Sequence, residues 1–173
     1  MRPEPKKVVI LSDLWGFRSD FPLEDTYRKY LPKHWKVEYF DSTLLGDIPR
    51  SITSQDEIHN HFVQGGIKRA SLALSQQIKD IDYLIGLSIG GMIAWKSALE
   101  TPPRHLICIS ATRLRKEVEK PNCPIYLFYG EHDVYKPSKE WVQKLAVKGV
   151  TYIDGGHDIY KYPEVIKQIL RRL

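Results

Sequence analysis

Six short apolar runs, separated by stretches of helical character, constrain the fold of this chain more than any other feature. Most of the runs are continuously apolar rather than alternating, which is typical of strands covered on both faces in a parallel sheet. The predicted strands are Val8–Leu11, Val37–Phe40, Tyr83–Leu87, Leu106–Ser110, Ile125–Tyr129 and Val150–Ile153. We therefore predict a doubly wound α/β fold, with a mainly parallel six-stranded sheet and helices on both faces.

Helices are predicted in the segments between these strands. They cover Leu23–Tyr30, about Gln55–Lys79, Ile89–Leu99, Ser138–Val147 and Glu164–Arg172. The stretch Leu44–Ser54, which contains Gly46 and Pro49, is predicted to be a loop. A chain of 173 residues without a linker or an internal repeat is expected to form a single domain over residues 1–173.

The composition argues against several classes of protein. The chain has no run of 18 apolar residues, and the apolar stretch after Lys7 is too short for a signal sequence, so we expect a cytoplasmic protein without membrane contacts. The net charge of +5 is spread along the chain, and its densest basic group, Arg113–Lys116, is interpreted as a solvated face. Nucleic acid is therefore not expected as a partner, and the oligomeric state is left open.

Cysteine and histidine offer no metal or redox centre in this sequence. Cys108 lies within an apolar run, where a cysteine acts as a small buried hydrophobe, and Cys123 precedes a strand. His59 and His61 are two residues apart on a predicted helix and so do not share a face. No metal site and no cofactor are predicted.

The pattern Gly86-Leu87-Ser88-Ile89-Gly90 lies between a predicted strand and a predicted helix. A serine between two glycines at such a turn is the setting of a nucleophile elbow, because small neighbours let the strand and helix approach while the hydroxyl stays exposed. The pattern alone is weak, since a chain of this length has an appreciable chance of matching it. Its position makes Ser88 a candidate nucleophile.

An acid and a histidine follow later strands, where ligand-binding loops of a parallel sheet gather. Asp133 follows the fifth predicted strand, and His157 follows the sixth. An imidazole activates a serine hydroxyl, and a carboxylate fixes the tautomer of that imidazole. Asp154 and Asp158 are rival acids close in sequence to His157.

The order Ser88, Asp133, His157, each after a strand, resembles the catalytic motifs of the α/β-hydrolase superfamily over nearly the whole chain. The resemblance is to a small, serine esterase-like member of that superfamily. It implies that Ser88 is the nucleophile, Asp133 the acid and His157 the general base.

The same resemblance places an oxyanion loop at Ser12–Phe17, where the usual His-Gly pair is absent and the form Asp-x-aromatic-Gly is closer to dienelactone-hydrolase-like members. The oxyanion hole would then pair the backbone N–H of Ile89 with that of Leu14, or with that of Trp15 in a shifted alignment. Asp13 is difficult to place, since a carboxylate near an oxyanion opposes its charge.

The connection Ala111–Pro124 is too short to hold the helical cap that many relatives insert there. We therefore expect an open site. Its predicted lining residues are Trp15, Phe17, Leu114, Val134 and Tyr135, and the loop Leu44–Pro49 is a further candidate.

The sequence thus predicts a serine hydrolase that cleaves small carboxylic esters or thioesters through an acyl-enzyme. One alternative is an acyltransferase that uses the same triad. The other is a non-catalytic binding or regulatory protein on the hydrolase fold, which the absent His-Gly pair and Asp13 suggest.

Overall fold

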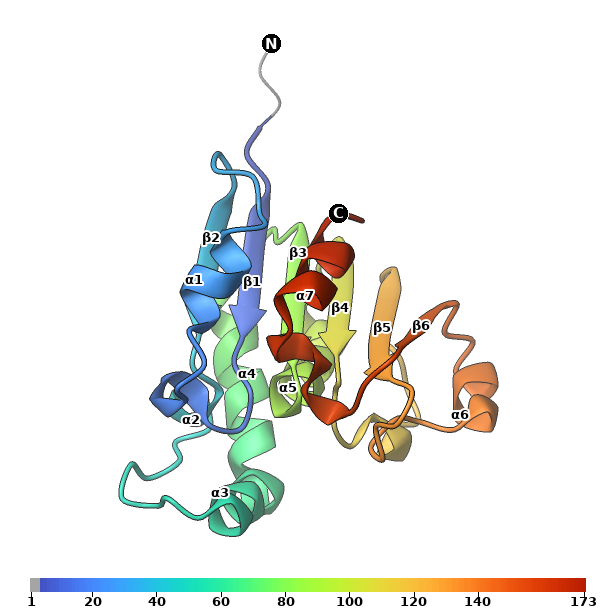
Figure 1. The fold of residues 1–173 in the computed structure, drawn as a ribbon. Helices are drawn as coiled ribbons and strands as arrows, with labels where there is room; N and C mark the ends of the chain where they lie inside the picture. The colour runs from blue at the N-terminus through green and yellow to red at the C-terminus, as the bar shows by residue number, and fades with distance from the viewer. Residues whose placement is uncertain (1–3) are drawn as a thin grey trace.

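The sheet is the centre of this computed structural model, which describes residues 4–173. Within those residues six parallel strands form one sheet in the order β2-β1-β3-β4-β5-β6, and Figure 1 shows their arrows pointing the same way. The strands are β1 Lys7–Leu11, β2 Lys36–Phe40, β3 Tyr83–Leu87, β4 His105–Ile109, β5 Ile125–Gly130 and β6 Gly149–Ile153. The predicted fold class is confirmed, and each strand agrees with its prediction to within one residue at either end.

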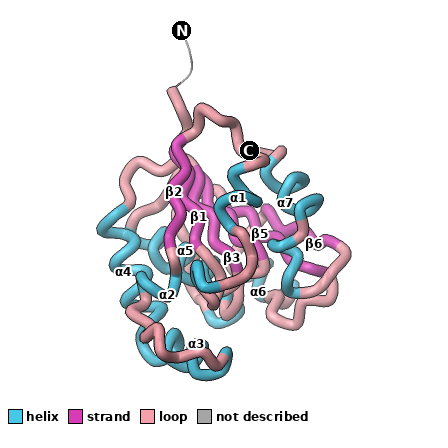
Figure 2. Tube along the Cα trace, turned by 60° about the vertical axis from the view of Figure 1, so that its left-hand side comes forward, coloured by secondary structure: helices cyan, strands magenta, loops and turns pink. Residues whose placement is uncertain are grey.

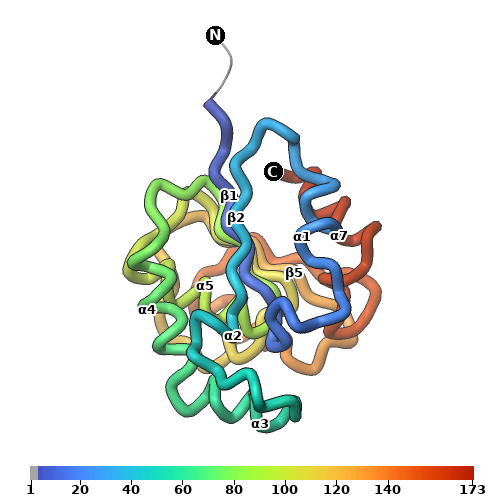
Figure 3. The backbone as a smooth tube through the Cα atoms, turned by 90° about the vertical axis from the view of Figure 1, so that its left-hand side faces the viewer, coloured from blue at the N-terminus to red at the C-terminus, as the bar shows by residue number. Residues whose placement is uncertain are grey.

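Helices cover both faces of the sheet. The helices are α1 Leu23–Arg28, α2 Ser42–Leu45, α3 Gln55–His61, α4 Ile67–Gln77, α5 Ile89–Glu100, α6 Lys139–Lys144 and α7 Pro163–Leu170. Figures 2 and 3 show α4 and α5 on one side of the strands and α1 and α7 on the other. Two separate apolar clusters result, one around Trp95 and Phe62, the other around Tyr27 and Ile166. None of the helices in residues 4–173 is long and apolar enough to cross a membrane.

The helix predicted over Gln55–Lys79 is two helices. A π-helical segment, Phe62–Gly66, separates α3 from α4, and Gly65 within it has a φ of 136°. Residues other than glycine rarely adopt this backbone conformation, and the chain changes direction at Gly65. This bend places α3 beyond the carboxyl ends of the strands (Figure 1).

The loop predicted over Leu44–Ser54 begins inside a short helix, α2. Asp41 caps this helix, because its carboxylate Oδ1 accepts hydrogen bonds from the N–H groups of Thr43 at 2.8 Å and Leu44 at 3.3 Å. Farther along the chain, the connection between β4 and β5 contains one 3-10 turn, Leu114–Lys116, and no longer helix. No cap domain is inserted there.

The close approach of β3 and α5 depends on the absence of a side chain at Gly86. A Cβ placed on Gly86 would overlap the carbonyl of Gly90 and lie 2.5 Å from Gly91 Cα, so both elements would have to move. We expect Gly86→Ala to lower the free energy of unfolding by about 1–3 kcal/mol or more, measured by chemical denaturation.

The control is Gly156→Ala, whose Cβ would meet only Asp158 Oδ1, at 3.8 Å. This variant should unfold near the wild-type midpoint. Equal stability of the two alanine variants would contradict a tight contact between β3 and α5.

Candidate active site

Ser88 lies in a strained turn at the carboxyl end of β3. Its φ of 53° and ψ of −119° fall outside the regions that residues with a side chain prefer. Backbone hydrogen bonds hold it on both sides: its N–H donates to Ile109 O at 3.0 Å, and its carbonyl accepts from Thr112 N–H at 3.2 Å. Because Ile89 begins α5, the serine hydroxyl stands beside a helix N-terminus.

Two further glycines, Gly90 and Gly91, allow the close contacts of this turn. A Cβ on Gly90 would overlap Ser12 O, and a Cβ on Gly91 would lie 2.5 Å from Ala111 Cβ. The turn is thereby pressed against the ends of β1 and β4. The sequence pattern around Ser88 is explained by these close contacts.

The structure brings together all three residues predicted as a triad. Ser88 Oγ lies 2.9 Å from His157 Nε2, and His157 Nδ1 lies 3.0 Å from Asp133 Oδ2. Asp133 is buried, and its other oxygen accepts the Tyr135 N–H at 2.9 Å. The relay is therefore continuous from hydroxyl to carboxylate.

The rival acids do not reach His157. Asp154 is 96% exposed and lies 3.9 Å from His132 instead. Asp158 Oδ1 accepts the hydroxyl of Tyr162 at 2.9 Å. Of these acids, Asp133 is the one that contacts the imidazole.

The turns that carry Asp133 and His157 are joined by backbone contacts. The N–H groups of Glu131 and His132 donate to Ile153 O at 2.8 Å and to Gly155 O at 3.0 Å. Gly130 has no room for a Cβ, because the Gly155 and Gly156 carbonyls fill that space. The separation of acid and base is thus set by backbone rather than by flexible side chains.

Two tyrosines fix the plane of the His157 ring. Tyr135 and Tyr160 both meet it edge to face, with ring centroids 4.9 Å and 6.0 Å away. The His157 side chain is nevertheless 30% exposed, so water reaches the base.

Asp13 has a structural role in the loop after β1. Its Oδ1 accepts the Trp15 N–H at 3.0 Å, and its Oδ2 accepts the Tyr160 hydroxyl at 2.8 Å. Burial raises the pKa of this carboxyl, and the Tyr160 and Trp15 hydrogen bonds offset part of that rise. Both oxygens are therefore occupied.

These bonds also distinguish the two oxyanion candidates. The Trp15 N–H is occupied by Asp13. The Leu14 N–H donates to no acceptor within residues 4–173, and Ile89, as the first residue of α5, has no intrahelical acceptor. The arrangement favours Leu14 and Ile89 as the pair of free donors beside Ser88.

A cavity of about 260 Å³ opens over Ser88. Of the predicted lining residues, Trp15 and Tyr135 border it. Phe17 borders a different hollow beside Asp41, Leu114 is fully buried, and Val134 is 82% exposed. None of these three residues borders the Ser88 cavity.

Several residues that border the cavity were not predicted from the sequence. They are Gln55, Asp56 and His59 from α3, Thr112, Arg113 and Arg115 from the segment after β4, and Tyr160. The α3 residues follow from the bend at Gly65, which the sequence pattern did not indicate. The segment after β4 could have been found, because it also follows a strand.

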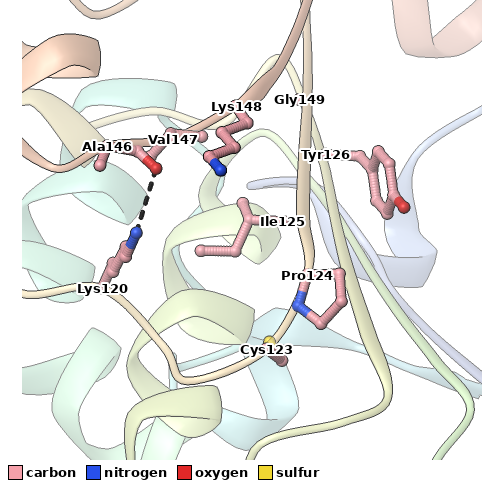
Figure 4. Close-up of a pocket in the computed structure, with 9 residues that line it drawn as sticks. All are labelled: Lys120, Cys123, Pro124, Ile125, Tyr126, Ala146, Val147, Lys148 and Gly149. Atoms are coloured by element: carbon pink, nitrogen blue, oxygen red, sulfur yellow. Dashed lines mark hydrogen bonds between the residues drawn. The ribbon is translucent and has the colours of Figure 1, made fainter.

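A larger hollow, of about 450 Å³, lies at the opposite end of the sheet. Figure 4 shows it beside the first residues of β5 and β6, with Lys120 bonded to Ala146 O. Burial raises the pKa of its Cys123 thiol to about 11, so this sulfur stays protonated at neutral pH. The triad lies at the other end, and the smaller cavity is the candidate active site.

Solved structures share this architecture. A lipase-esterase related protein from Clostridium acetobutylicum superposes with a TM-score of 0.67 at 12% identity, covering 99% of this chain and 94% of that one. An alpha-beta serine hydrolase homologue from Coxiella burnetii gives 0.62 at 18%, covering 96% and 84%. An α/β serine hydrolase without lid from Xanthomonas campestris gives 0.62 at 15%, covering 99% and 83%.

The chain has the α/β-hydrolase fold. Its six-stranded parallel sheet and its short β4–β5 connection agree with the structure described as having no lid. No protein-family model matches the sequence, and no curated protein matches it. At these identities the similarity establishes the α/β-hydrolase fold and leaves the chemistry to the site itself.

Tyr160→Phe tests the role of Asp13. The variant removes the hydroxyl donor that stabilises the ionised carboxylate, so the pKa of Asp13 should rise further. A raised carboxyl pKa means that the folded protein keeps this proton to higher pH than the unfolded chain, and stability falls as pH rises through that range. The loss of unfolding free energy should therefore be about 1–3 kcal/mol near pH 7 and smaller near pH 4.

Denaturation midpoints at both pH values measure this effect. Tyr162→Phe is the matched control, because its hydroxyl bonds the exposed Asp158 and its loss should change stability little. A loss of unfolding free energy in Tyr160→Phe that does not change with pH would contradict the proposed link between the Tyr160 hydroxyl and the pKa of Asp13.

Proposed function

We propose that this protein is a serine hydrolase that cleaves small carboxylic esters or thioesters. The observation that carries the proposal is the unbroken relay of Ser88, His157 and Asp133, with distances of 2.9 Å and 3.0 Å, at a strained turn. A structural serine needs neither the strain nor the imidazole. A binding protein on this fold would not need the relay either, so the relay favours an enzyme.

The geometry supports a two-step reaction. Ser88 Oγ attacks the carbonyl carbon while His157 Nε2 takes the hydroxyl proton, and Asp133 stabilises the resulting imidazolium. The tetrahedral oxyanion accepts hydrogen bonds from the Leu14 and Ile89 N–H groups, each worth roughly 3 kcal/mol in such sites. His157 then protonates the departing alcohol or thiol, and the acyl group stays on Ser88.

Water completes the cycle by attacking the acyl-enzyme, with His157 again as the base. A 30% exposed imidazole and the absence of a cap over residues 111–124 leave this path open. The cavity of about 260 Å³ favours small acyl groups over long chains. Transfer of the acyl group to an alcohol or amine is the alternative that the same relay supports.

Ser88→Ala tests the nucleophile. Wild-type protein should react covalently with a fluorophosphonate probe and hydrolyse 4-nitrophenyl acetate, whereas the variant should lose labelling and at least about 10³-fold in kcat. Intact-protein mass spectrometry and release of 4-nitrophenol measure the two effects.

Wild-type protein that neither labels nor turns over the ester would refute the enzymatic proposal and favour the binding protein. If added alcohol diverts most of the acyl product from acid to ester, transfer replaces hydrolysis as the activity.

Asp133→Asn tests the acid. The amide cannot stabilise the imidazolium, so kcat should fall roughly 10³–10⁴-fold, as in serine proteases, while the probe still finds Ser88 slowly. Asp154→Asn is a matched control, because this carboxylate is 96% exposed and lies away from the imidazole. Loss of activity in the control and retention in Asp133→Asn would reverse the assignment.

A further inference from the structure

Two arginines border the Ser88 cavity, and the proposed hydrolysis does not use them. Arg113 and Arg115 come from the turn directly after β4. Arg113 is half-buried and has a φ of 67°, a left-handed conformation that costs a residue with a side chain free energy. Leu114, between them, is fully buried in the core, so the backbone of this turn is anchored beside the cavity, with Arg113 half-buried and Arg115 exposed.

Neither guanidinium has an internal partner. Within residues 4–173, Arg113 and Arg115 form no ion pair and donate no side-chain hydrogen bond. Five other arginines do have such partners, whether a carbonyl, a hydroxyl or a carboxylate: Arg18, Arg28, Arg69, Arg104 and Arg172. Arg50 and Arg171 have none within residues 4–173, but neither borders the Ser88 cavity. Unpaired donors in a cavity are available to a ligand.

The cavity lining also holds two carboxylates and two histidines besides the arginines. Both oxygens of Asp13 accept hydrogen bonds, from the Trp15 N–H and the Tyr160 hydroxyl, so this carboxylate is not directed at the arginines. Asp56 is exposed on the first turn of α3 and forms no ion pair with either arginine within residues 4–173. Burial and the nearby Arg113 lower the pKa of His59, and Asp56 offsets part of this change.

We propose that the substrate of this site carries an anionic group, a carboxylate or a phosphate, that Arg113 and Arg115 bind while the scissile carbonyl lies at Ser88. The inference rests on the proposed hydrolase function and names its substrate class. A guanidinium presents a planar pair of N–H donors that matches a carboxylate or phosphate, which a neutral ester does not offer. Asp56, which also borders the cavity, disfavours rather than assists such a ligand.

Matched esters test the preference. Ethyl hydrogen succinate and its neutral amide, ethyl succinamate, have nearly the same shape and differ in charge. Wild-type kcat/KM should be at least about 10-fold higher for the anionic ester, and the advantage should shrink as salt is added. A second pair places the charge on the alcohol side: acetoxyacetate against acetoxyacetamide, with the acetate ester of 2-hydroxyethyl phosphate as the phosphate arm.

Variants assign the preference to residues. Arg115→Gln and Arg113→Asn, the latter tolerant of the left-handed backbone, should each reduce the anionic-to-neutral ratio of kcat/KM about 10-fold. Lys116→Gln is the matched control, because it removes a charge from the same turn at a residue outside the cavity lining. Asp56→Asn should raise the ratio, an effect that a purely structural role of the turn would not produce.

Binding separates this inference from the proposed function. Ser88→Ala protein should bind ethyl hydrogen succinate in calorimetry, and adding Arg115→Gln should weaken that Kd several-fold. Binding without turnover by the wild type would refute hydrolysis and retain the anionic ligand. Equal kcat/KM for charged and neutral members of both pairs, unchanged by Arg115→Gln, would overturn the inference and retain hydrolysis.

Discussion

The close contact between the end of β3 and the start of α5 is the constraint on which the rest of this structure depends. It places Ser88 at a φ of 53°, and it is possible only because Gly86, Gly90 and Gly91 have no side chains to overlap neighbouring backbone and Ala111. The strain is offset by packing on both sides of the turn, through hydrogen bonds to β4 and the following segment. This turn fixes the position of the Ser88 hydroxyl relative to the Ile89 N–H, the first N–H of α5.

A second set of backbone contacts positions the rest of the relay. Backbone hydrogen bonds join the turns after β5 and β6, so the positions of Asp133 and His157 are coupled. The loop after β1 is fixed differently, by the buried carboxylate of Asp13 between Trp15 and Tyr160. In the proposed hydrolase, Asp13 takes the place of the His-Gly pair in shaping the oxyanion loop. Its two oxygens accept hydrogen bonds from Trp15 and Tyr160, which stabilise a carboxylate beside the proposed oxyanion hole.

Two connections between the strands shape the site. The β4–β5 connection contains only a short turn, so no cap covers the triad. The bend at Gly65 carries α3 over the carboxyl ends of the strands, where it forms one wall of the cavity. The turn with Arg113 and Arg115 also borders the cavity and gives this otherwise open site a charged character. Substrate choice in the proposed hydrolase thus depends on two connections rather than on the triad.

The six strands and their parallel sheet could be predicted from the amino-acid sequence, and Ser88, Asp133 and His157 were its candidates for the relay, with Asp154 and Asp158 as rival acids. These depend on local patterns: continuous apolar runs of strand length, glycines beside a serine, and polar residues placed directly after strands. Because the strands are parallel, their carboxyl ends lie at one edge of the sheet, and the residues that follow them meet there.

The walls of the site depend on the tertiary structure. Phe17 and Val134 come after strands but do not border the cavity, whereas Arg113 and Arg115, from the basic group interpreted as a solvated face, do border it. The choice of Leu14 over Trp15 depends on a hydrogen bond from Trp15 to Asp13. Local patterns record which residues are buried or strained, whereas the direction of a side chain at a loop depends on contacts between segments far apart in the chain.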